Sequence, residues 1–254
     1  MKRTAILRAG ALLVLCLAGA SAIAAGNPAV PANIAAAVSD SARPAADTER
    51  DANRKPGATL AFAGVKPGMT VLELAPGRGY YTRLLSIVVG PHGKVFAVTS
   101  PPKPGAPQPP VQAIAADAHY ANVTPIVKPV TEPLVLAEKV DLVWTSQNYH
   151  DFHNLSGIDV ATINKRVFDE LKPGGTYVVL DHSAEAGSGA RDTNTLHRID
   201  EDTVKQEVEA AGFKYVGESD ALRNKADPRT AKVFDPSIQG HTDQFLLIFR
   251  KPST

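Results

Sequence analysis

Cysteine is almost absent from this chain of 254 residues, and no long stretch of positive charge occurs in it. The single cysteine is Cys16, which lies in the first apolar stretch. Lysine and arginine number 27 against 26 aspartate and glutamate residues, so the formal charge is +1. Without a second cysteine, the chain can form neither an internal disulfide nor a thiolate metal site. Without a long basic run, a dedicated DNA-binding or RNA-binding protein is disfavoured.

Residues 1–25 have the three regions of a secretory signal peptide. Positive charge at the start is followed by the apolar residues 11–17 and by the small-x-small cleavage site Ala22-Ile23-Ala24. Glycine and serine interrupt the apolar run before it reaches the length of a membrane span, so a retained anchor is the less favoured alternative. We therefore expect export, with no stable membrane insertion after cleavage.

The next part of the chain changes character twice. Residues 26–43 are rich in alanine and proline and resemble a flexible tether. Residues 45–62 are amphipathic and carry alternating charges, which predicts helices interrupted near Pro56. These charges are typical of a solvated helix face, and a role in closing an active site is the alternative. The length from residue 44 to residue 254 suits one α/β domain.

Short β-rich runs alternate with helical spacing in this domain. Strand, loop, helix and strand in succession imply right-handed crossovers between parallel strands, whose carboxyl ends form a ligand-binding edge. The predicted fold is a Rossmann-like α/β fold with a mostly parallel sheet and helices on both faces. We expect strands at 70–74, 94–99, 124–130, 140–145, 176–181, 213–217 and 244–250, and helices at 81–88, 111–120, 158–171 and 201–211.

A glycine-containing loop follows the first predicted strand. Its sequence is Ala75-Pro76-Gly77-Arg78-Gly79, and Glu73 precedes it. Small residues allow the backbone to approach a nucleoside closely, and amides at the start of the next helix can hold a polar group. An ordinary tight turn is the alternative. A dinucleotide site fits poorly, because its third glycine would have to stand at Thr82.

The segment 73–79 resembles the first motif of class I S-adenosylmethionine-dependent methyltransferases. Residues 140–144 resemble the fourth strand of that family, and residues 171–180 resemble its next turn and fifth strand. The likeness spans residues 44–251, and the segments 148–151 and 196–200 are most similar to predicted bacterial methyltransferases with export signals. It implies a small-molecule acceptor, a bacterial periplasmic location, and S-adenosylmethionine bound by Glu73, Ala75, Pro76, Gly77 and Gly79.

Two positions outside the first motif differ from, or could complete, the cofactor-binding pattern of the family. The family usually has a carboxylate for the ribose hydroxyls at the end of the second strand, where this chain has Ser100. Ser100 could make one hydrogen bond to the cofactor, but a neutral hydroxyl cannot replace a bidentate carboxylate. Glu132, after the third strand, could reach the adenine or belong to a surface turn. The missing acid keeps a second function open, an exported binding or accessory protein that retains the fold without transferring methyl groups.

Polar residues follow the fourth and fifth predicted strands, where the resemblance implies the methyl-acceptor site. His150 is the best candidate for a proton-accepting base, because its ordinary pKa lies near neutrality. Hydrogen bonding within the loop is the alternative for each of these residues. The residues expected at this site are His150 and Asp151 as catalytic groups, and Asn148, Tyr149, Asp181 and His182 as substrate contacts.

The same region suggests a metal site as an alternative. His150, Asp151, His153, Asp181 and His182 are residue types that bind zinc, iron or manganese. Their spacing matches no recognised ligand motif, and separate hydrogen-bonding roles account for them, so we expect no metal ion. For His197, which is remote in sequence, a structural or substrate-facing role is expected.

Overall fold

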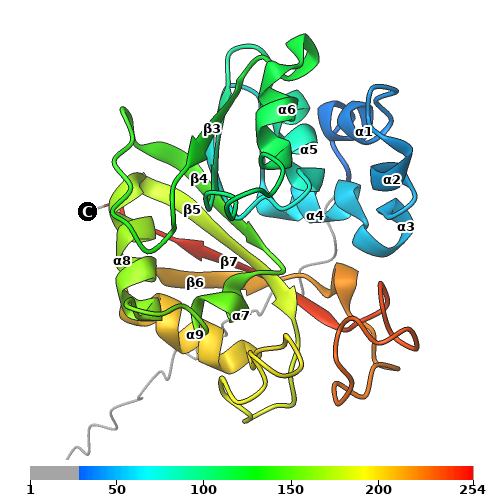
Figure 1. Cartoon of the computed structure of the whole chain (residues 1–254), viewed down its shortest axis with the longest axis vertical. Helices are drawn as coiled ribbons and strands as arrows, with labels where there is room; N and C mark the ends of the chain where they lie inside the picture. Colours follow the sequence, from blue (N-terminus) through cyan, green and yellow to red (C-terminus); the bar gives the residue numbers. More distant parts are fainter. Residues whose placement is uncertain (1–28, 254) are drawn as a thin grey trace, which may run out of the picture.

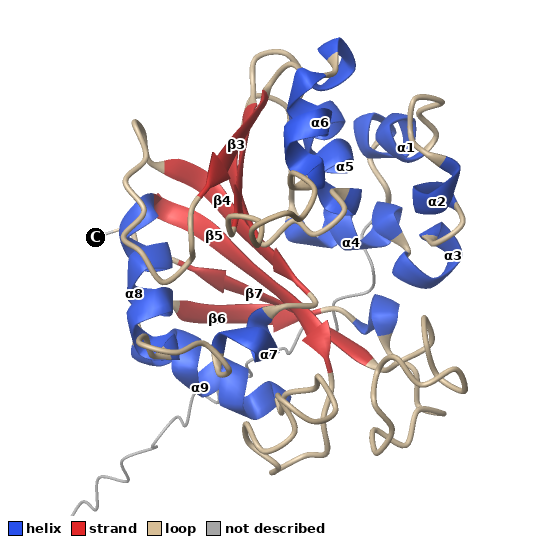
Figure 2. Cartoon of the chain, viewed as in Figure 1, coloured by secondary structure: helices blue, strands red, loops and turns tan. Residues whose placement is uncertain are grey.

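The computed structural model describes residues 29–253, in which seven strands form one sheet with helices on both sides (Figures 1 and 2). The strand order is β3-β2-β1-β4-β5-β7-β6. The strands are β1 (Thr70–Leu74), β2 (Lys94–Thr99), β3 (Val123–Val127), β4 (Val140–Ser146), β5 (Leu171–His182), β6 (Lys214–Glu218) and β7 (Gln244–Arg250). The predicted signal peptide lies outside the described residues. No described helix combines the length and apolar character needed to cross a membrane.

The direction of the strands brings several loops to one edge of the sheet. β1 to β5 are parallel, whereas β7 runs antiparallel to both β5 and β6. Because of this reversal, β7 begins where β5 ends, and His182 pairs with Gln244. The loop before β7 therefore joins the loops that follow β1, β4 and β5. The predicted Rossmann-like fold with a mostly parallel sheet is confirmed.

Two apolar layers hold the helices against the sheet. Side chains of β1 alternate between them, since Val71 packs in one layer and Leu72 in the other. One face carries α1 (Ala32–Val38), α4 (Pro56–Ala63), α5 (Tyr80–Val89) and α6 (Pro110–Ala116). The other carries α7 (Tyr149–Phe152), α8 (Val160–Glu170) and α9 (Glu201–Ala210). The short helices α2 (Ala45–Thr48) and α3 (Asp51–Arg54) precede α4.

The start of the described chain differs from its prediction. Residues 32–38 form α1, in which Ile34 is 1% exposed and Ala37 is fully buried. Both belong to the same apolar layer as α4 and α5. Alanine is the best helix former, so an alanine-rich segment that can bury one apolar face folds onto the domain. The prediction of a flexible tether is therefore wrong for residues 32–38.

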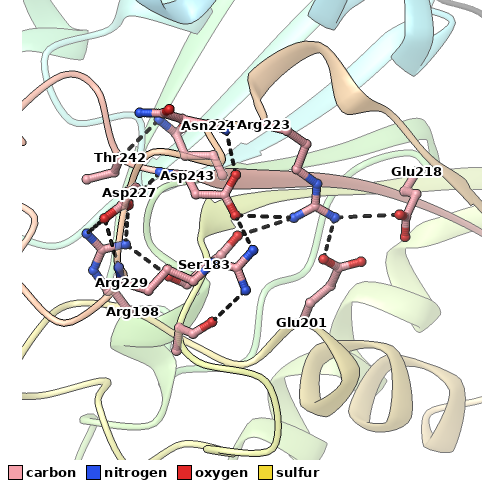
Figure 3. A network of polar contacts seen from close by, with 12 residues as sticks. Ser183, Arg198, Glu201, Glu218, Arg223, Asn224, Asp227, Arg229, Thr242 and Asp243 are labelled. Atoms are coloured by element: carbon pink, nitrogen blue, oxygen red, sulfur yellow. Dashed lines mark hydrogen bonds and ion pairs between the residues drawn. The ribbon is translucent and has the colours of Figure 1, made fainter.

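Buried ion pairs fix the two long loops beside the sheet. Arg198, in the segment between β5 and α9, lies 2.8 Å from Asp227, and both side chains are fully buried. Arg229 lies 2.7 Å from Asp243, which comes just before β7. Figure 3 shows how these pairs connect with Arg223 in one network. Because breaking a buried pair leaves an uncompensated charge, the network gives both loops a defined position.

Candidate active site

Unusual backbone conformations gather at the carboxyl edge of the sheet. Ala75 after β1, Gln147 after β4 and His197 in the segment before α9 have φ angles of 50°, 59° and 56°. Left-handed conformations are costly for residues with a Cβ atom, and such residues concentrate at functional sites. This edge is therefore the candidate active site.

The loop after β1 needs both of its glycines, for different reasons. Gly77 has φ 57°, and a Cβ atom there would have no neighbour within 4 Å, so the space in front of the loop is open. Gly79 has φ 81°, and a Cβ atom there would lie 2.1 Å from Cδ1 of Ile114. Gly79 thus allows α6 to pack against the loop, whereas Gly77 leaves room for a ligand. The neighbouring Ala75 is exposed and Pro76 is partly exposed.

Glu73 lies beneath this loop and is 2% exposed. The hydroxyl of Thr82 donates a hydrogen bond to Oε2 of Glu73 over 2.6 Å. Burial raises the pKa of Glu73 to about 7, although the Thr82 hydrogen bond and the charges of Arg54 and Arg83 oppose the shift. A cation brought close to this carboxyl would favour its ionised form. The site therefore suits an amino group.

Ser100 and Glu132 lie farther along the same edge, and both are exposed. Ser100 follows β2. Glu132 is in a turn closed by a 3.0 Å hydrogen bond from its backbone N–H to the carbonyl of Pro129, and its side chain lies 3.6 Å from Lys128. The backbone at Glu132 therefore forms a surface turn, which was the second alternative for this residue. No contact among the described residues joins either side chain to Glu73.

Asn148 connects the ends of β1 and β4. Its Nδ2 donates to the carbonyls of Leu74 and Ala75, each over 3.1 Å, and its Oδ1 is hydrogen-bonded to the hydroxyl of Thr145. These bonds hold the end of β4 against the glycine-containing loop. Because the amide already has protein partners, Asn148 positions the site.

Tyr149 points away from the edge into the core. It is fully buried, and its ring packs in the apolar layer under α8 and α9. Its hydroxyl donates to Glu207 over 3.0 Å and accepts from Asn164 over 2.8 Å. Burial raises the pKa of Tyr149. The prediction that Tyr149 contacts substrate does not fit this position, because Tyr149 begins α7 and packs with Phe152 in the apolar core.

His150 and Asp181 form a buried pair. Nδ1 of His150 lies 2.8 Å from Oδ1 of Asp181, and the backbone N–H of His150 donates to Oδ2 over 2.8 Å. Burial alone would lower the pKa of His150, but the charges of Asp181 and Asp151 raise it. Nε2 lies 3.4 Å from Oδ1 of Asp151, whose side chain is half-exposed. A carboxylate that orients an imidazole in this way is typical of an acid–base pair.

His182 and His153 have other partners. Nδ1 of His182 lies 2.7 Å from the hydroxyl of Thr242, and burial lowers the pKa of His182 to about 4. This ring lines a cavity of about 160 Å³. Nε2 of His153 lies 3.2 Å from Glu207, on the side of α9. The cavity is also lined by Arg50, Arg54, Gln147, Phe234 and Gln244.

Arg54 belongs to the site, although its sequence pattern did not distinguish it from neighbouring helix charges. Its guanidinium is hydrogen-bonded to Oε1 of Gln147 and lies 4.6 Å from the ring centre of Tyr80. Within residues 29–253 it has no carboxylate partner within 4.0 Å, and burial lowers its pKa. An arginine without a counter-ion beside a cavity suits an anionic group.

Comparisons with known proteins agree on the architecture. No family model and no curated protein matches the chain. Three similar solved structures are a methyltransferase from Aquifex aeolicus, one from Mesorhizobium loti, and SpnF, a [4+2]-cyclase. Both methyltransferases are described as S-adenosylmethionine-dependent.

The sequence identities are low, but the shared length is large. The Aquifex protein is 20% identical in sequence, and the match covers 75% of this chain and 86% of the Aquifex chain with a TM-score of 0.50. The Mesorhizobium protein is 16% identical, and the match covers 80% of this chain and 100% of the other with a TM-score of 0.55. SpnF is 18% identical, and the match covers 83% of this chain and 82% of SpnF with a TM-score of 0.56. The chain therefore has the fold of S-adenosylmethionine-dependent methyltransferases.

Proposed function

We propose that this protein is an S-adenosylmethionine-dependent methyltransferase that acts on a small molecule. One observation carries the proposal: the glycine-containing loop with its buried Glu73 lies next to the His150–Asp181 pair. Asn148 joins the two through hydrogen bonds to Leu74 and Ala75. A cofactor site and a proton-accepting group are thus held together on rigid strand ends.

The charges beside the loop suit the amino-acid end of the cofactor. Glu73 is a buried carboxyl whose hydrogen-bond donor is Thr82, and Arg54 is a guanidinium without a carboxylate partner in the described part of the chain. A zwitterion presents one ammonium and one carboxylate, which these two side chains match. The open space at Gly77 leaves room for the rest of the molecule. S-adenosylmethionine supplies the methyl group when bound.

On the acceptor side, His150 is the group placed to take a proton. Asp181 accepts a hydrogen bond from Nδ1, so the neutral ring carries its lone pair on Nε2, on the side of the half-exposed Asp151. Methyl transfer is a displacement at carbon, which requires alignment of the acceptor and, for a protonated acceptor, a base. Asp151, beside Nε2, raises the basicity of this ring.

The cavity of about 160 Å³ that Arg54, Gln147 and His182 line at the same edge of the sheet favours a small acceptor over a polymer. The formal net charge of +1 also disfavours a nucleic acid as the acceptor. The signal-peptide pattern supports export to the bacterial periplasm. Amino-terminal sequencing of protein from the native envelope should begin near Ala25 or Gly26, and an intact Met1 would contradict export with cleavage.

A non-catalytic binding or accessory role is the second candidate. Ser100 supports it, because no carboxylate follows β2 to bind the ribose hydroxyls. SpnF, which has the same fold, is described as a cyclase, and a shared fold does not fix the reaction.

The decisive experiment follows a labelled methyl group. The purified protein is incubated with methyl-labelled S-adenosylmethionine and an unfractionated extract of the native envelope, whose small molecules and macromolecules are then separated. We expect label in the small-molecule fraction, a strong reduction with His150→Gln, and no change with His153→Gln as the matched control. Label found only in macromolecules would refute the proposed acceptor class. Cofactor binding without transfer to any fraction would favour the accessory role.

A further inference from the structure

Three potential metal ligands converge at the open side of the candidate active site. They belong to His150, Asp151 and His197, and one ligand atom from each lies within 4.8 Å of the other two. Oδ1 of Asp151 is 3.4 Å from His150 and 3.7 Å from His197. These separations are close to those between neighbouring ligands of one metal ion, whose bonds measure about 2.0–2.2 Å.

The hydrogen bonding of His150 makes Nε2 the ring nitrogen that can bind a metal ion. Asp181 can only accept a hydrogen bond when ionised, so Nδ1 of His150 carries a hydrogen. In the neutral ring, Nε2 then has a lone pair that faces the carboxylate of Asp151. Nε2 of His150 and an oxygen of Asp151 are therefore placed as two potential ligands of one metal ion.

The position of Asp181 is that of an outer-shell group. Histidines that bind metals commonly donate their other ring N–H to a carboxylate, which fixes the ring and makes the ligating nitrogen more basic. Asp181 is fully buried and also accepts from the backbone N–H of His150 over 2.8 Å. The ring of His150 is therefore held with Nε2 directed at Asp151.

His197 is held in place by the loop network. Its backbone has φ 56°, a strained conformation for a residue with a side chain. The next residue, Arg198, is fully buried, pairs with Asp227 over 2.8 Å and donates to the carbonyl of Ser183 over 3.0 Å (Figure 3). On its other side, the ring of His197 packs edge-on against Phe234, with 5.0 Å between ring centres. The fold thus maintains a costly conformation that brings this imidazole to the cluster.

We propose that His150, Asp151 and His197 bind a divalent transition-metal ion. Two imidazoles and one carboxylate suit iron, zinc, cobalt or manganese better than calcium or magnesium, which prefer oxygen ligands. The side chains of Asp151 and His197 are 52% and 26% exposed, so the remaining coordination positions face the open side. Three protein ligands with open positions are typical of metal sites that bind water or substrate.

This set differs from the one suggested by sequence. His153 and His182 are engaged with Glu207 and Thr242, and Asp181 supports His150 from behind. The inference stands apart from methyl transfer, because metal binding is measurable without cofactor or acceptor. Since Nε2 of His150 cannot hold a proton and a metal ion together, metal binding would restrict its proton-accepting role to the metal-free protein.

The test is a titration of the purified, chelator-treated protein with Co²⁺ and Zn²⁺, followed by calorimetry and, for Co²⁺, by visible absorption. We expect one ion per chain and a cobalt spectrum that shows nitrogen ligands. Asp151→Asn and His197→Ala should each weaken binding by about a hundredfold or more, at least as much as loss of an outer-shell partner. His153→Ala is the matched control and should bind as the parent does. Ca²⁺ should not compete.

Several results would overturn the proposal. One is the absence of saturable binding by parent protein whose melting temperature shows that it is folded. Another is binding that Asp151→Asn and His197→Ala leave unchanged, which would place the ion elsewhere. Both variants alter partly exposed side chains, so their folding is checked by melting temperature before titration. Loss of methyl transfer alone would not bear on this result.

Discussion

The two halves of the candidate active site are built in different ways. The cofactor half, after β1, comes from one continuous segment in which Glu73, Gly77 and Gly79 lie within seven residues. The acceptor half is assembled from segments that are remote in sequence, including His150, Asp181 and His197. The conformation of the cofactor loop depends mainly on its own backbone. The acceptor half instead depends on contacts that hold separate segments together.

This difference predicts where substitutions will act. In the cofactor half, a change should alter affinity for S-adenosylmethionine and leave the rest of the molecule in place. In the acceptor half, changes to supporting residues should alter stability, and only changes to groups at the open edge should alter chemistry. The predictions below test that separation, from the largest effect to the smallest.

The largest effect is expected from the buried pair that supports His197. Asp227→Ala leaves the guanidinium of Arg198 buried without a counter-ion and should lower the free energy of unfolding by about 3–5 kcal/mol, measured by denaturant titration. Asp169→Ala removes the exposed pair with Lys165 on α8 and should leave stability almost unchanged. Equal, small effects in both variants would mean that the loop network does not fix the acceptor half.

His150→Ala should lower turnover by about a hundredfold or more, the usual effect of losing a positioned base, while cofactor affinity stays unchanged. In the parent, turnover should rise with pH, because the base must be unprotonated and the pKa of His150 is raised above its ordinary value. The measurements are turnover against pH and calorimetric cofactor affinity, after an acceptor has been found. Loss of cofactor affinity would instead place His150 in the cofactor half.

Glu73→Gln should weaken S-adenosylmethionine binding by about tenfold or more, because a charge-assisted contact to the amino group is lost. Glu138→Gln, at a partly exposed position before β4, is the matched control.

Glu73→Gln should also change how the stability of the cofactor-free protein depends on pH. The pKa of Glu73 is raised to about 7 in the folded state, so the folded state favours the protonated form more than the unfolded state does. Its contribution to stability is present below the ordinary pKa of 4.5 and is lost as pH rises through 7. Glu73→Gln should remove this loss and melt at a higher temperature than the parent at pH 8. A lower melting temperature there would contradict the assigned environment of Glu73.

Tyr149→Phe should give the smallest effect. It removes a buried hydroxyl bonded to Glu207 and Asn164, which is worth about 1 kcal/mol of stability. Turnover should not change, since the ring lies in the core. If the variant had normal stability but reduced turnover, Tyr149 would have to contact the acceptor after all.

The strand and helix pattern could be predicted because periodicity and turn residues are local signals. The glycine-containing loop was predictable for the same reason, and His150 and Asp181 were expected near one edge because parallel strands end together. The inward direction of Tyr149, the convergence of His197 with Asp151 and the approach of Arg54 depend on long-range packing. The tether prediction failed at Ile34, since composition alone does not show whether an alanine-rich helix has a surface to cover.

The most direct test of the account is calorimetric titration of the folded protein with S-adenosylmethionine, in parallel with Gly77→Val and His150→Ala. The account predicts saturable one-to-one binding by the parent, the same affinity in His150→Ala, and a large loss in Gly77→Val, whose side chain would occupy the open space above the loop. No saturable binding by the folded parent, or unchanged affinity in a folded Gly77→Val protein, would contradict it.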